Sequence, residues 1–297
     1  MVDHAVAVIG LGSMGMGAAR SCIRAGLETY GVDINRDALG VLKDAGAAGV
    51  SENCGDFAER LDSVVLLVIN AHQCRTILFD MGLADRLRPG TAVMVSATMA
   101  ADDISDIGAR LGNRRLIVLD APVSGGAAKA DAGDMTVMAA GSDDAFSSLA
   151  PVLEAVAGKV YRVGSRLGMG AMVKIIHQLL AGVHIAVGAE AMAMAARAGI
   201  PLEVMYEVVT NAAGNSWMFE NRMKHVVDGD YAPKSMVDIF VKDLGLVTDA
   251  AQSLKFPLYL GSTAYQMFTA ASNSGHGQED DSAVIKIFDG IDLPGNR

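Results

Sequence analysis

The stretch GMGAMVKIIHQLLAGVHIAVGAEAMAMAARAG, residues 168–199, divides the sequence into two halves of different pattern. It contains no proline and is rich in small and unbranched residues, so we expect one helix that spans roughly 45 Å. Gly199 and Pro201 supply its stop. Strand-like and helix-like segments alternate before this helix, whereas only helical patterns follow it. The helix is apolar on nearly all sides, which predicts burial between other elements.

Three polar side chains fall on one face of this helix near its start. Lys174, His177 and Gln178 stand at i, i+3 and i+4, so one ligand could reach all three. A buried lysine is costly unless it is paired or neutral, and the positive helix N-terminus favours the free amine that a general base needs. We interpret Lys174 as a catalytic candidate. The alternatives are a lysine that reaches solvent and, for His177 and Gln178, satisfied core positions.

The composition is that of a globular protein long enough for two domains, with 297 residues of which 51% are hydrophobic. A net charge of −10 argues against a nucleic-acid or anionic-membrane partner. Cys22, Cys54 and Cys74 lack metal-binding spacing and are expected to be core thiols in a reducing compartment. The N-terminus lacks a basic signal-peptide region, and no charge-free apolar run is long enough to span a bilayer. We therefore expect a cytoplasmic protein that acts on a small molecule.

The first chemical motif is GLGSMG at residues 10–15, which follows the strand-like HAVAVIG and opens a helix-like segment. This is the context of a dinucleotide-binding turn. Gly10 permits the tight turn, Gly12 lets the backbone approach a pyrophosphate, and Gly15 allows the helix to pack closely on the strand. The predicted cofactor-binding residues of this turn are Gly10, Leu11, Gly12, Ser13, Met14 and Gly15.

The second strand-like segment, ETYGVD, ends in Asp33, which lies about 20 residues beyond the glycine turn. A carboxylate at this position accepts hydrogen bonds from an adenosine ribose and repels a 2′-phosphate, which favours NAD over NADP. Arg36 argues in the other direction. The alternative role for Asp33 is a helix cap, because a helix-like segment begins directly after it.

Further pairs of apolar strands and amphipathic helices follow. Such alternation predicts a parallel, doubly wound sheet, in which ligands bind beyond the carboxyl ends of the strands. Asn70, Ser96, Thr98 and residues 120–126 are therefore expected around the nicotinamide end of the cofactor. The expected strands are residues 48–50, 64–70, 92–98, 116–124, 136–141 and 159–163, with helices from Asn53, Gln73, Asp102 and Asp143.

The second chemical motif is DAPVSGG at residues 120–126. The exposed amides of Ser124, Gly125 and Gly126 could hold a substrate carboxylate in a backbone nest. The alternative is a loop that simply needs positive φ at the two glycines.

The second half of the chain is predicted to contain helices at residues 202–211, 218–227, 237–253 and 257–272, and a short one from Ser282. We place a sheet domain at residues 1–164 and an all-helical domain at residues 165–297. Apolar stripes and seventeen methionines favour a homodimer or homotetramer. Spacing alone favours a solvated charge pair for Lys242 and Asp243. Residues 276–281 indicate a polar loop that caps the last helix rather than a metal site, and no metal is expected.

Together these motifs resemble the β-hydroxyacid dehydrogenases, the family of 3-hydroxyisobutyrate dehydrogenase, tartronate semialdehyde reductase and, more distantly, 6-phosphogluconate dehydrogenase. The landmarks are GLGSMG, Asp33, DAPVSGG, GMGAMVKIIHQ and VKDLGL, and the match covers nearly the whole chain. The resemblance implies a Rossmann-type domain, a long joining helix and an all-α domain. It also implies a catalytic Lys174, carboxylate binding by residues 124–126, and cofactor contacts from Thr98 and Lys242.

Four further stretches are most similar to family members that oxidise L-threonate: KIIHQLLAGVHIA, AGNSWMFEN, DIFVKDLGL and GHGQEDDSAVIKIF. By this resemblance His177, Gln178 and Asn215 orient substrate hydroxyls. Most members carry asparagine where this chain has Gln178, which reaches about one methylene further. A histidine like His177 occurs in 6-phosphogluconate dehydrogenases, but their phosphate-binding features are not evident.

The expected activity is NAD-dependent oxidation of a small hydroxy acid, with L-threonate as the leading substrate. The cofactor carries the redox chemistry, while the protein supplies position and proton transfer. Activity on 3-hydroxyisobutyrate or tartronate semialdehyde is the first alternative. A non-catalytic dinucleotide-sensing module is the second, and Lys174 together with a complete substrate loop argues against it.

Overall fold

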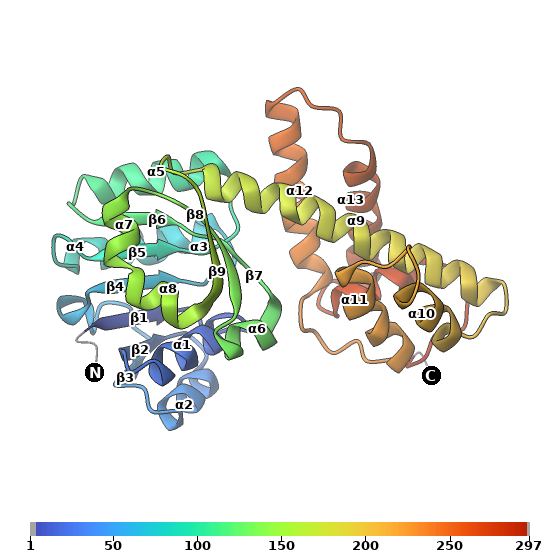
Figure 1. The fold of residues 1–297 in the computed structure, drawn as a ribbon, viewed down its shortest axis with the longest axis horizontal. Helices are drawn as coiled ribbons and strands as arrows, with labels where there is room; N and C mark the ends of the chain where they lie inside the picture. Colours follow the sequence, from blue (N-terminus) through green and yellow to red (C-terminus); the bar gives the residue numbers. More distant parts are fainter. Residues whose placement is uncertain (1–3, 296–297) are drawn as a thin grey trace. The chain divides into compact units, whose positions relative to one another are not determined.

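The computed structural model describes residues 4–295 (Figure 1). The chain forms two compact units, Met1–Lys174 and Ile175–Arg297. The first unit thus extends beyond residue 164, the predicted end of the sheet domain, and includes the start of the long helix.

Within the described residues, nine strands of the first unit form one sheet in the order β3-β2-β1-β4-β5-β6-β8-β7, with β9 beside β8. The strands are β1 Ala5–Ile9, β2 Glu28–Val32, β3 Gly49–Ser51, β4 Ser63–Leu66, β5 Ala92–Val95, β6 Ile117–Asp120, β7 Val123–Ser124, β8 Met135–Ala140 and β9 Ala157–Gly164. The helices are α1 Gly15–Arg24, α2 Arg36–Asp44, η1 Ala58–Arg60, α3 Ala71–Arg75, η2 Thr76–Asp80, α4 Leu83–Arg86, α5 Ala101–Gly112, α6 Gly126–Ala132, α7 Asp143–Ser148 and α8 Ala150–Val156.

Strands β1 to β6 are parallel, as the alternation of strands and helices predicted. The edge beyond β6 differs, because β8 is antiparallel to both β6 and β7. β9 then runs parallel to β8. The doubly wound arrangement is therefore confirmed for β1 to β6, and an antiparallel strand joins the sheet beyond it.

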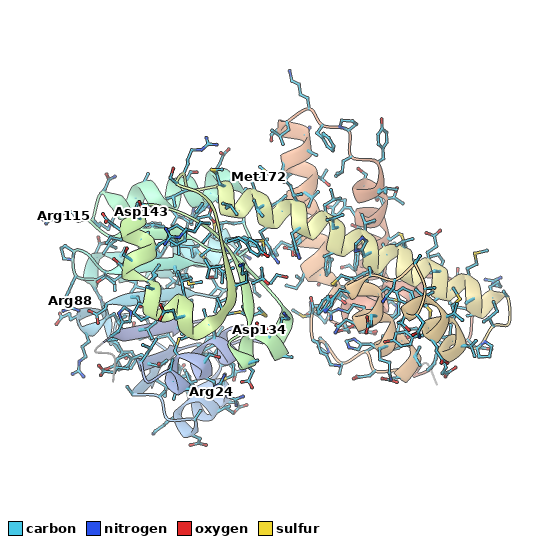
Figure 2. All side chains as sticks on the ribbon, viewed as in Figure 1. Arg24, Arg88, Arg115, Asp134, Asp143 and Met172 are labelled. Atoms are coloured by element: carbon cyan, nitrogen blue, oxygen red, sulfur yellow. The ribbon has the colours of Figure 1, made fainter. Side chains whose placement is uncertain are left out.

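Helices cover both faces of this sheet (Figure 1). Successive residues of a strand point to opposite faces, and Val64 and Val65 on β4 accordingly belong to different apolar clusters. One cluster joins the sheet to α3, α4 and α5, and the other joins it to α1, α2, α7 and α8. All three cysteines are free and buried in these clusters, as expected. Charged side chains such as Arg88 and Asp143 lie at the surface of this unit (Figure 2).

The helix predicted from Asn53 is wrong. Residues 53–57 form turns, and only the short η1 follows. The Asn53 side chain accepts a hydrogen bond from the amide of Gly55, and the Ser51 hydroxyl accepts one from the amide of Asn53. Such local side-chain bonds compete with a helix for the backbone amides.

The second unit is helical throughout its described part, as predicted. Its elements are α9 Met169–Arg197, which begins in the first unit, α10 Leu202–Thr210, α11 Trp217–Asp228, α12 Val237–Ser253, α13 Tyr259–Ala271, η3 Ser272–His276 and η4 Asp281–Ile287. Ile185, Met192, Phe240 and Phe268 belong to its apolar core.

The long helix α9 is less buried than its composition predicted. Ile176, Leu180, Val187 and Met194 are each more than half exposed. Among the described residues, α9 is the one helix that is long and apolar enough to cross a membrane. Half of the residues in its most apolar stretch are buried within the protein. Core helices share those features, so they are weak evidence for a membrane span.

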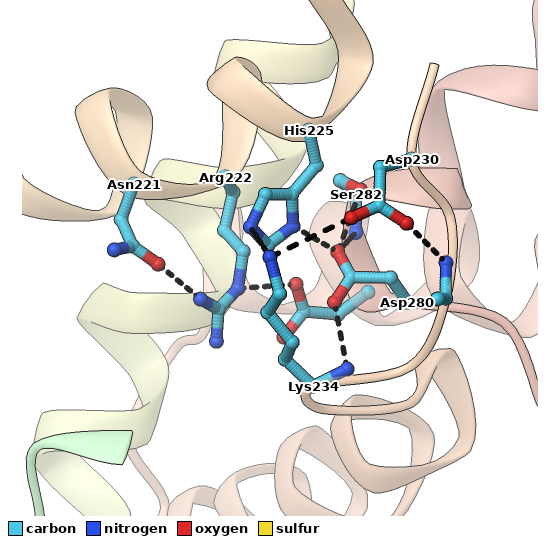
Figure 3. A network of polar contacts seen from close by, with 9 residues as sticks. Asn221, Arg222, His225, Asp230, Lys234, Asp280 and Ser282 are labelled. Carbon is cyan, nitrogen blue, oxygen red and sulfur yellow. Dashed lines mark hydrogen bonds and ion pairs between the residues drawn. The ribbon is translucent and has the colours of Figure 1, made fainter. Parts of the chain in front are cut away.

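A network of polar side chains joins several segments of the second unit (Figure 3). The buried Asp280 accepts a hydrogen bond from Nδ1 of His225 at 2.9 Å, and Nζ of Lys234 lies 3.1 Å from Nε2 of the same ring. Beside it, Nε of Arg222 bonds to the buried Asp281 at 2.6 Å. These contacts tie α11 to the start of η4, and Lys234 adds the loop that follows α11.

Candidate functional site

The glycine turn of the first unit has the geometry that its motif predicted. Gly10 has φ +92°, and a Cβ there would meet the carbonyl oxygen of Leu67 at 2.9 Å. A Cβ on Gly15 would meet the carbonyl oxygen of Gly10 at 1.7 Å, so α1 packs against the turn as only glycine allows. A Cβ on Gly12 would meet nothing within 4 Å. The turn therefore leaves open space at the position where a pyrophosphate would approach the backbone.

Asp33 follows β2, and its carboxylate lies against this turn. One oxygen accepts a hydrogen bond from the amide of Leu11, and the other accepts one from the amide of Asn35 at 2.8 Å. The cap of α2 is instead Asn35, whose side chain accepts from the amides of Asp37 and Ala38. The helix-cap alternative for Asp33 is therefore wrong, and its carboxylate borders the dinucleotide turn.

Arg36 begins α2 at the surface. Its Nε lies 2.7 Å from Oε1 of Glu52, and its side chain is 82% exposed. The guanidinium is thus paired with a neighbouring carboxylate, although an exposed pair of this kind is weak and could rearrange.

The carboxyl ends of the parallel strands lie side by side. Ile9 pairs with Val32 and with Leu66, Leu66 pairs with Val95, and Val95 pairs with Asp120. Asp33, Asn70, Thr98 and Asp120 each stand at or just beyond these ends, at the edge where such sheets bind ligands. The Asn70 side chain caps α3 by accepting from the amide of Gln73 at 2.9 Å.

The loop predicted to bind carboxylate follows β6. Ser124 ends β7, and Gly125 and Gly126 have φ +139° and +72°. Both glycines therefore have the positive φ that the alternative interpretation required, and they lead directly into α6. Their use in substrate binding stays a prediction.

Lys174 lies on α9 in the first unit and is 7% exposed. The chain reaches it through GMG, residues 168–170. Just before α9, the amide of Gly168 donates a hydrogen bond to the buried carboxylate of Asp120 at 2.9 Å, and the amide of Ala171 donates another at 3.1 Å. Asp120 was predicted only as part of the stretch 120–126 around the nicotinamide end of the cofactor, and not as a partner of the helix that carries Lys174. The position of the lysine thus depends on a residue 54 positions earlier in the chain.

In the second unit, four polar side chains form one line of contacts. His177 Nδ1 lies 3.0 Å from Oε1 of Gln178, and Gln178 Nε2 donates to Oδ2 of Asp243 at 2.5 Å. Nζ of Lys242 lies 2.7 Å from Oδ1 of Asp243. The structure thus brings together the predicted residues His177, Gln178 and Lys242, and adds Asp243 as the partner of Gln178 and Lys242.

The solvated charge pair that spacing favoured for Lys242 and Asp243 is wrong. Asp243 is 2% exposed, because α12 buries it together with Phe240, Leu244 and Val247. No periodic signal marked this aspartate, since its partner Gln178 stands 65 residues away.

Asn215 does not join this line of contacts. Its amide nitrogen donates to the carbonyl oxygen of Thr210 and to Glu220, both at 3.3 Å. Its buried Oδ1 has no hydrogen-bond partner among the described residues, so an acceptor is left available there.

Residues 276–281 hold one another and cap the last helix, as predicted. Asp280 is the cap of η4 and accepts from the amide of Ser282. His276 lies 3.0 Å from Glu279, which also pairs with Lys286 at 2.6 Å. Within residues 4–295, no three His, Cys, Asp or Glu side chains are grouped closely enough to hold a metal ion.

Comparison with known proteins agrees with this geometry. A family model described as the NAD binding domain of 6-phosphogluconate dehydrogenase matches residues 5–164, and one described as NAD-binding of NADP-dependent 3-hydroxyisobutyrate dehydrogenase matches residues 168–288. L-threonate dehydrogenase of Pectobacterium atrosepticum is 71% identical over 293 residues, which cover 98% of this chain and 96% of that protein. The L-threonate dehydrogenase of Escherichia coli K12 is 68% identical, with 98% and 97% covered.

A solved structure titled 3-hydroxyisobutyrate dehydrogenase, from Salmonella typhimurium, is 64% identical and matches with a TM-score of 0.94 over 96% of this chain and 100% of that one. Sequence identity and fold thus agree over almost the full length. The chain therefore belongs to the 3-hydroxyisobutyrate dehydrogenase family, and it is a hydroxyacid dehydrogenase with a domain that binds NAD(P).

Proposed function

We propose that the protein oxidises L-threonate to its 2-oxo acid with NAD as the acceptor and Lys174 as the general base. The observation that carries the proposal is the buried lysine on the first turns of α9, in a chain that is 71% identical to an L-threonate dehydrogenase. A buried amine near the positive end of a helix is disfavoured in its charged form, which suits it to accept a proton.

The protein's part in the reaction is position and proton transfer. NAD, when bound, supplies the hydride acceptor. The turn at residues 10–15 and Asp33 hold the cofactor's pyrophosphate and ribose, as their geometry supports. The amides of residues 124–126 hold the substrate carboxylate, and Lys174 takes the hydroxyl proton. Thr98 and Lys242 are proposed cofactor contacts.

Gln178 is proposed to orient a substrate hydroxyl rather than to transfer protons, since an amide does not titrate. The side-chain oxygen of Gln178 lies next to His177, and its nitrogen donates to Asp243. A 180° flip of the side-chain amide would therefore break these contacts. Gln178→Asn shortens the side chain by one methylene, so the amide reaches less far. We expect it to change preference among hydroxy acids of different length while the pH dependence of turnover stays the same. An unchanged preference would assign Gln178 to the core alone.

Preference for NAD over NADP follows from Asp33. A 2′-phosphate at the ribose position would stand beside the Asp33 carboxylate, and the nearby Arg36 already pairs with Glu52. We expect kcat/KM with NAD to exceed that with NADP by at least about tenfold. Equal values would show that Arg36 leaves Glu52 to bind the phosphate. Arg36→Ala should leave activity with NAD intact and serves as the matched variant.

The substrate is tested by NADH formation with a panel of L-threonate, 3-hydroxyisobutyrate and the reduced form of tartronate semialdehyde. The 3-hydroxyisobutyrate dehydrogenase title of the Salmonella structure makes that acid the second candidate. L-threonate should give the highest kcat/KM. A higher value for another acid would reassign the substrate, and NAD binding without turnover of any of them would revive the sensing module.

We also propose that a second copy of the chain covers the exposed face of α9. Ile176, Leu180, Val187 and Met194 are spaced by four, seven and seven residues, so they form one apolar stripe along the helix. Exposed apolar stripes of this extent usually mark an interface, and a two-fold axis would place the same stripe on both sides. Leu180→Glu should lower the mass measured by light scattering, whereas Lys43→Glu on α2 should not. A monomeric wild type would exclude the interface.

A further inference from the structure

Asp120 stands where β6 ends and is 2% exposed. Its Oδ2 accepts two backbone hydrogen bonds from residues that follow 48 and 51 positions later, the amides of Gly168 and Ala171. These amides belong to the turn before α9 and to the first turn of the helix, where amides have no partner within the helix itself. The carboxylate therefore caps the helix that carries Lys174, although the strands β7 to β9 and the helices α6 to α8 lie between the two in the sequence.

The helix start also lies too close to the sheet to shift without cost. A Cβ on Gly170 would meet the carbonyl oxygens of Met138 at 2.7 Å and of Asp120 at 2.8 Å. Gly168 has φ +93°, and a Cβ there would meet the carbonyl oxygen of Ala101 at 3.0 Å. Glycine at position 170 therefore lets the backbone approach β6 and β8 closely, and glycine at position 168 lets it approach the start of α5.

The donors to Asp120 are backbone amides. Burial raises the pKa of Asp120 to about 6, while the amides of Ala171 and Gly168 oppose this increase. The carboxylate is therefore held by backbone amides and by the positive end of α9. Asp120 therefore fixes the position of the backbone at the start of α9, and not the position of a charged side chain.

We propose that Asp120 is a positioning residue for Lys174. Lys174 follows Ala171 by three residues, or about 4.5 Å along the helix, and Ser124 follows Asp120 by four residues in the same segment. One carboxylate thus sets the distance between the proposed base and the loop proposed to bind the substrate carboxylate. The assignment rests on the proposed function, because it gives Asp120 a role in that reaction.

The test compares Asp120→Ala, Asp120→Asn and the control Ser142→Ala, which removes the hydroxyl that caps α7 in the same unit. Turnover with L-threonate and NAD, the KM for NAD, and amide hydrogen exchange of residues 168–174 are measured for each. Asp120→Ala should lower kcat at least about tenfold, with the KM for NAD changed less than about twofold, and should speed exchange at the helix start. Asp120→Asn keeps an acceptor oxygen and should restore most of the kcat, whereas Ser142→Ala should leave kcat unchanged.

An unchanged kcat in a folded Asp120→Ala with faster exchange would overturn the positioning role, as would equal losses in the alanine and asparagine variants. If Asp120→Ala does not fold, Asp120→Ser takes its place, because its hydroxyl is one bond shorter than the carboxylate and cannot accept from both amides as Oδ2 does. An unchanged kcat in that variant would equally contradict the role. A wild type that oxidises none of the acids would instead refute the proposed function. Hydrogen exchange would in that case still report whether Asp120 anchors α9.

Discussion

Asp120 in the first unit and Asp280 in the second are both almost inaccessible to solvent, at 2% and 0% exposure, yet their pKa values move in opposite directions. Burial raises the pKa of Asp120 to about 6, because only backbone amides oppose it. Burial acts on Asp280 as well, but hydrogen bonds from His225 and Ser282 outweigh it and lower the pKa to about 2. The partners, and not the depth of burial, decide the outcome.

The difference separates two uses of a buried carboxylate. Asp280 accepts from the His225 ring, from the amide of Lys234, and from the amide and hydroxyl of Ser282, so it joins three segments of the second unit. Asp120 joins one strand end to one helix start. We therefore expect changes at Asp280 to act on stability and changes at Asp120 to act on turnover.

The largest expected effect is on stability in the second unit. Asp280→Ala leaves His225, the buried amide of Ser282 and the partly buried amide of Lys234 without their acceptor, which should cost about 3–5 kcal/mol. Urea unfolding followed by the fluorescence of Trp217, the single tryptophan, reports this unit directly because Trp217 begins α11. The matched control is Asp228→Ala on α11, whose half-exposed carboxylate pairs with Lys224. It should change stability by less than about 0.5 kcal/mol, and similar losses in both variants would contradict the contrast.

A second prediction uses the pH dependence of stability. The pKa of Asp120 is higher in the folded state than the ordinary 3.8, so between these values the folded protein binds the proton that the unfolded chain has lost. Its contribution to stability is therefore complete below about pH 4 and is lost as the pH rises through about 6. In the wild type, this titration should lower the free energy of unfolding by up to about 3 kcal/mol between pH 4 and 7, and Asp120→Asn should remove that decrease. The free energy of unfolding of the first unit is measured against pH for both proteins. The same pH dependence in the variant and the wild type would disprove this prediction.

Asp280 should show the opposite sign in a different range. Its folded pKa lies below 3.8, so its contribution is complete above about pH 4 and is lost as the pH falls through about 2. In Asp280→Asn, the fluorescence of Trp217 should depend less on pH between about 4 and 2 than in the wild type. If the fluorescence of Asp280→Asn differed from that of the wild type only between pH 4 and 7, the predicted contrast between Asp280 and Asp120 would be wrong.

The smallest expected effect concerns a single donor to Asp280. Ser282→Ala removes the hydroxyl that lies 2.6 Å from Oδ1 and leaves the amide of the same residue in place. A hydrogen bond to an ionised carboxylate contributes about 1.5–3 kcal/mol, so urea unfolding followed by Trp217 fluorescence should show a loss of that size. A loss as large as that of Asp280→Ala would mean that the hydroxyl, and not the histidine, dominates the site.

Elements with strong local signals could be predicted from the sequence. The long helix, the glycine turn and the alternation of strands and helices each follow from residues that are close together, and each is present. The helix from Asn53 failed because Ser51 and Asn53 use their side chains to form turns. The antiparallel β8 was missed because strand direction depends on how the chain returns after α6, which no local pattern records.

The candidate site divides in the same way. Gly10, Gly15 and Asp33 were found because their spacing is itself the motif. Asp120 and Asp243 were missed as partners because their hydrogen bonds reach 48 and 65 residues along the chain. The sequence around Asp120 and Asp243 does not indicate that either side chain is buried. Both become buried only when the helices pack.

The central claim, that Lys174 is the base in NAD-linked oxidation of a hydroxy acid, is tested most directly by Lys174→Met. Methionine keeps the length and the apolar stem but cannot accept a proton, and Lys159→Met, an exposed lysine on β9, is the matched control. With L-threonate and saturating NAD, we predict that Lys174→Met lowers kcat at least about a hundredfold, with unchanged NAD binding, while Lys159→Met keeps wild-type turnover. A Lys174→Met enzyme that keeps most of its turnover would show that another group takes the proton, and would contradict the account.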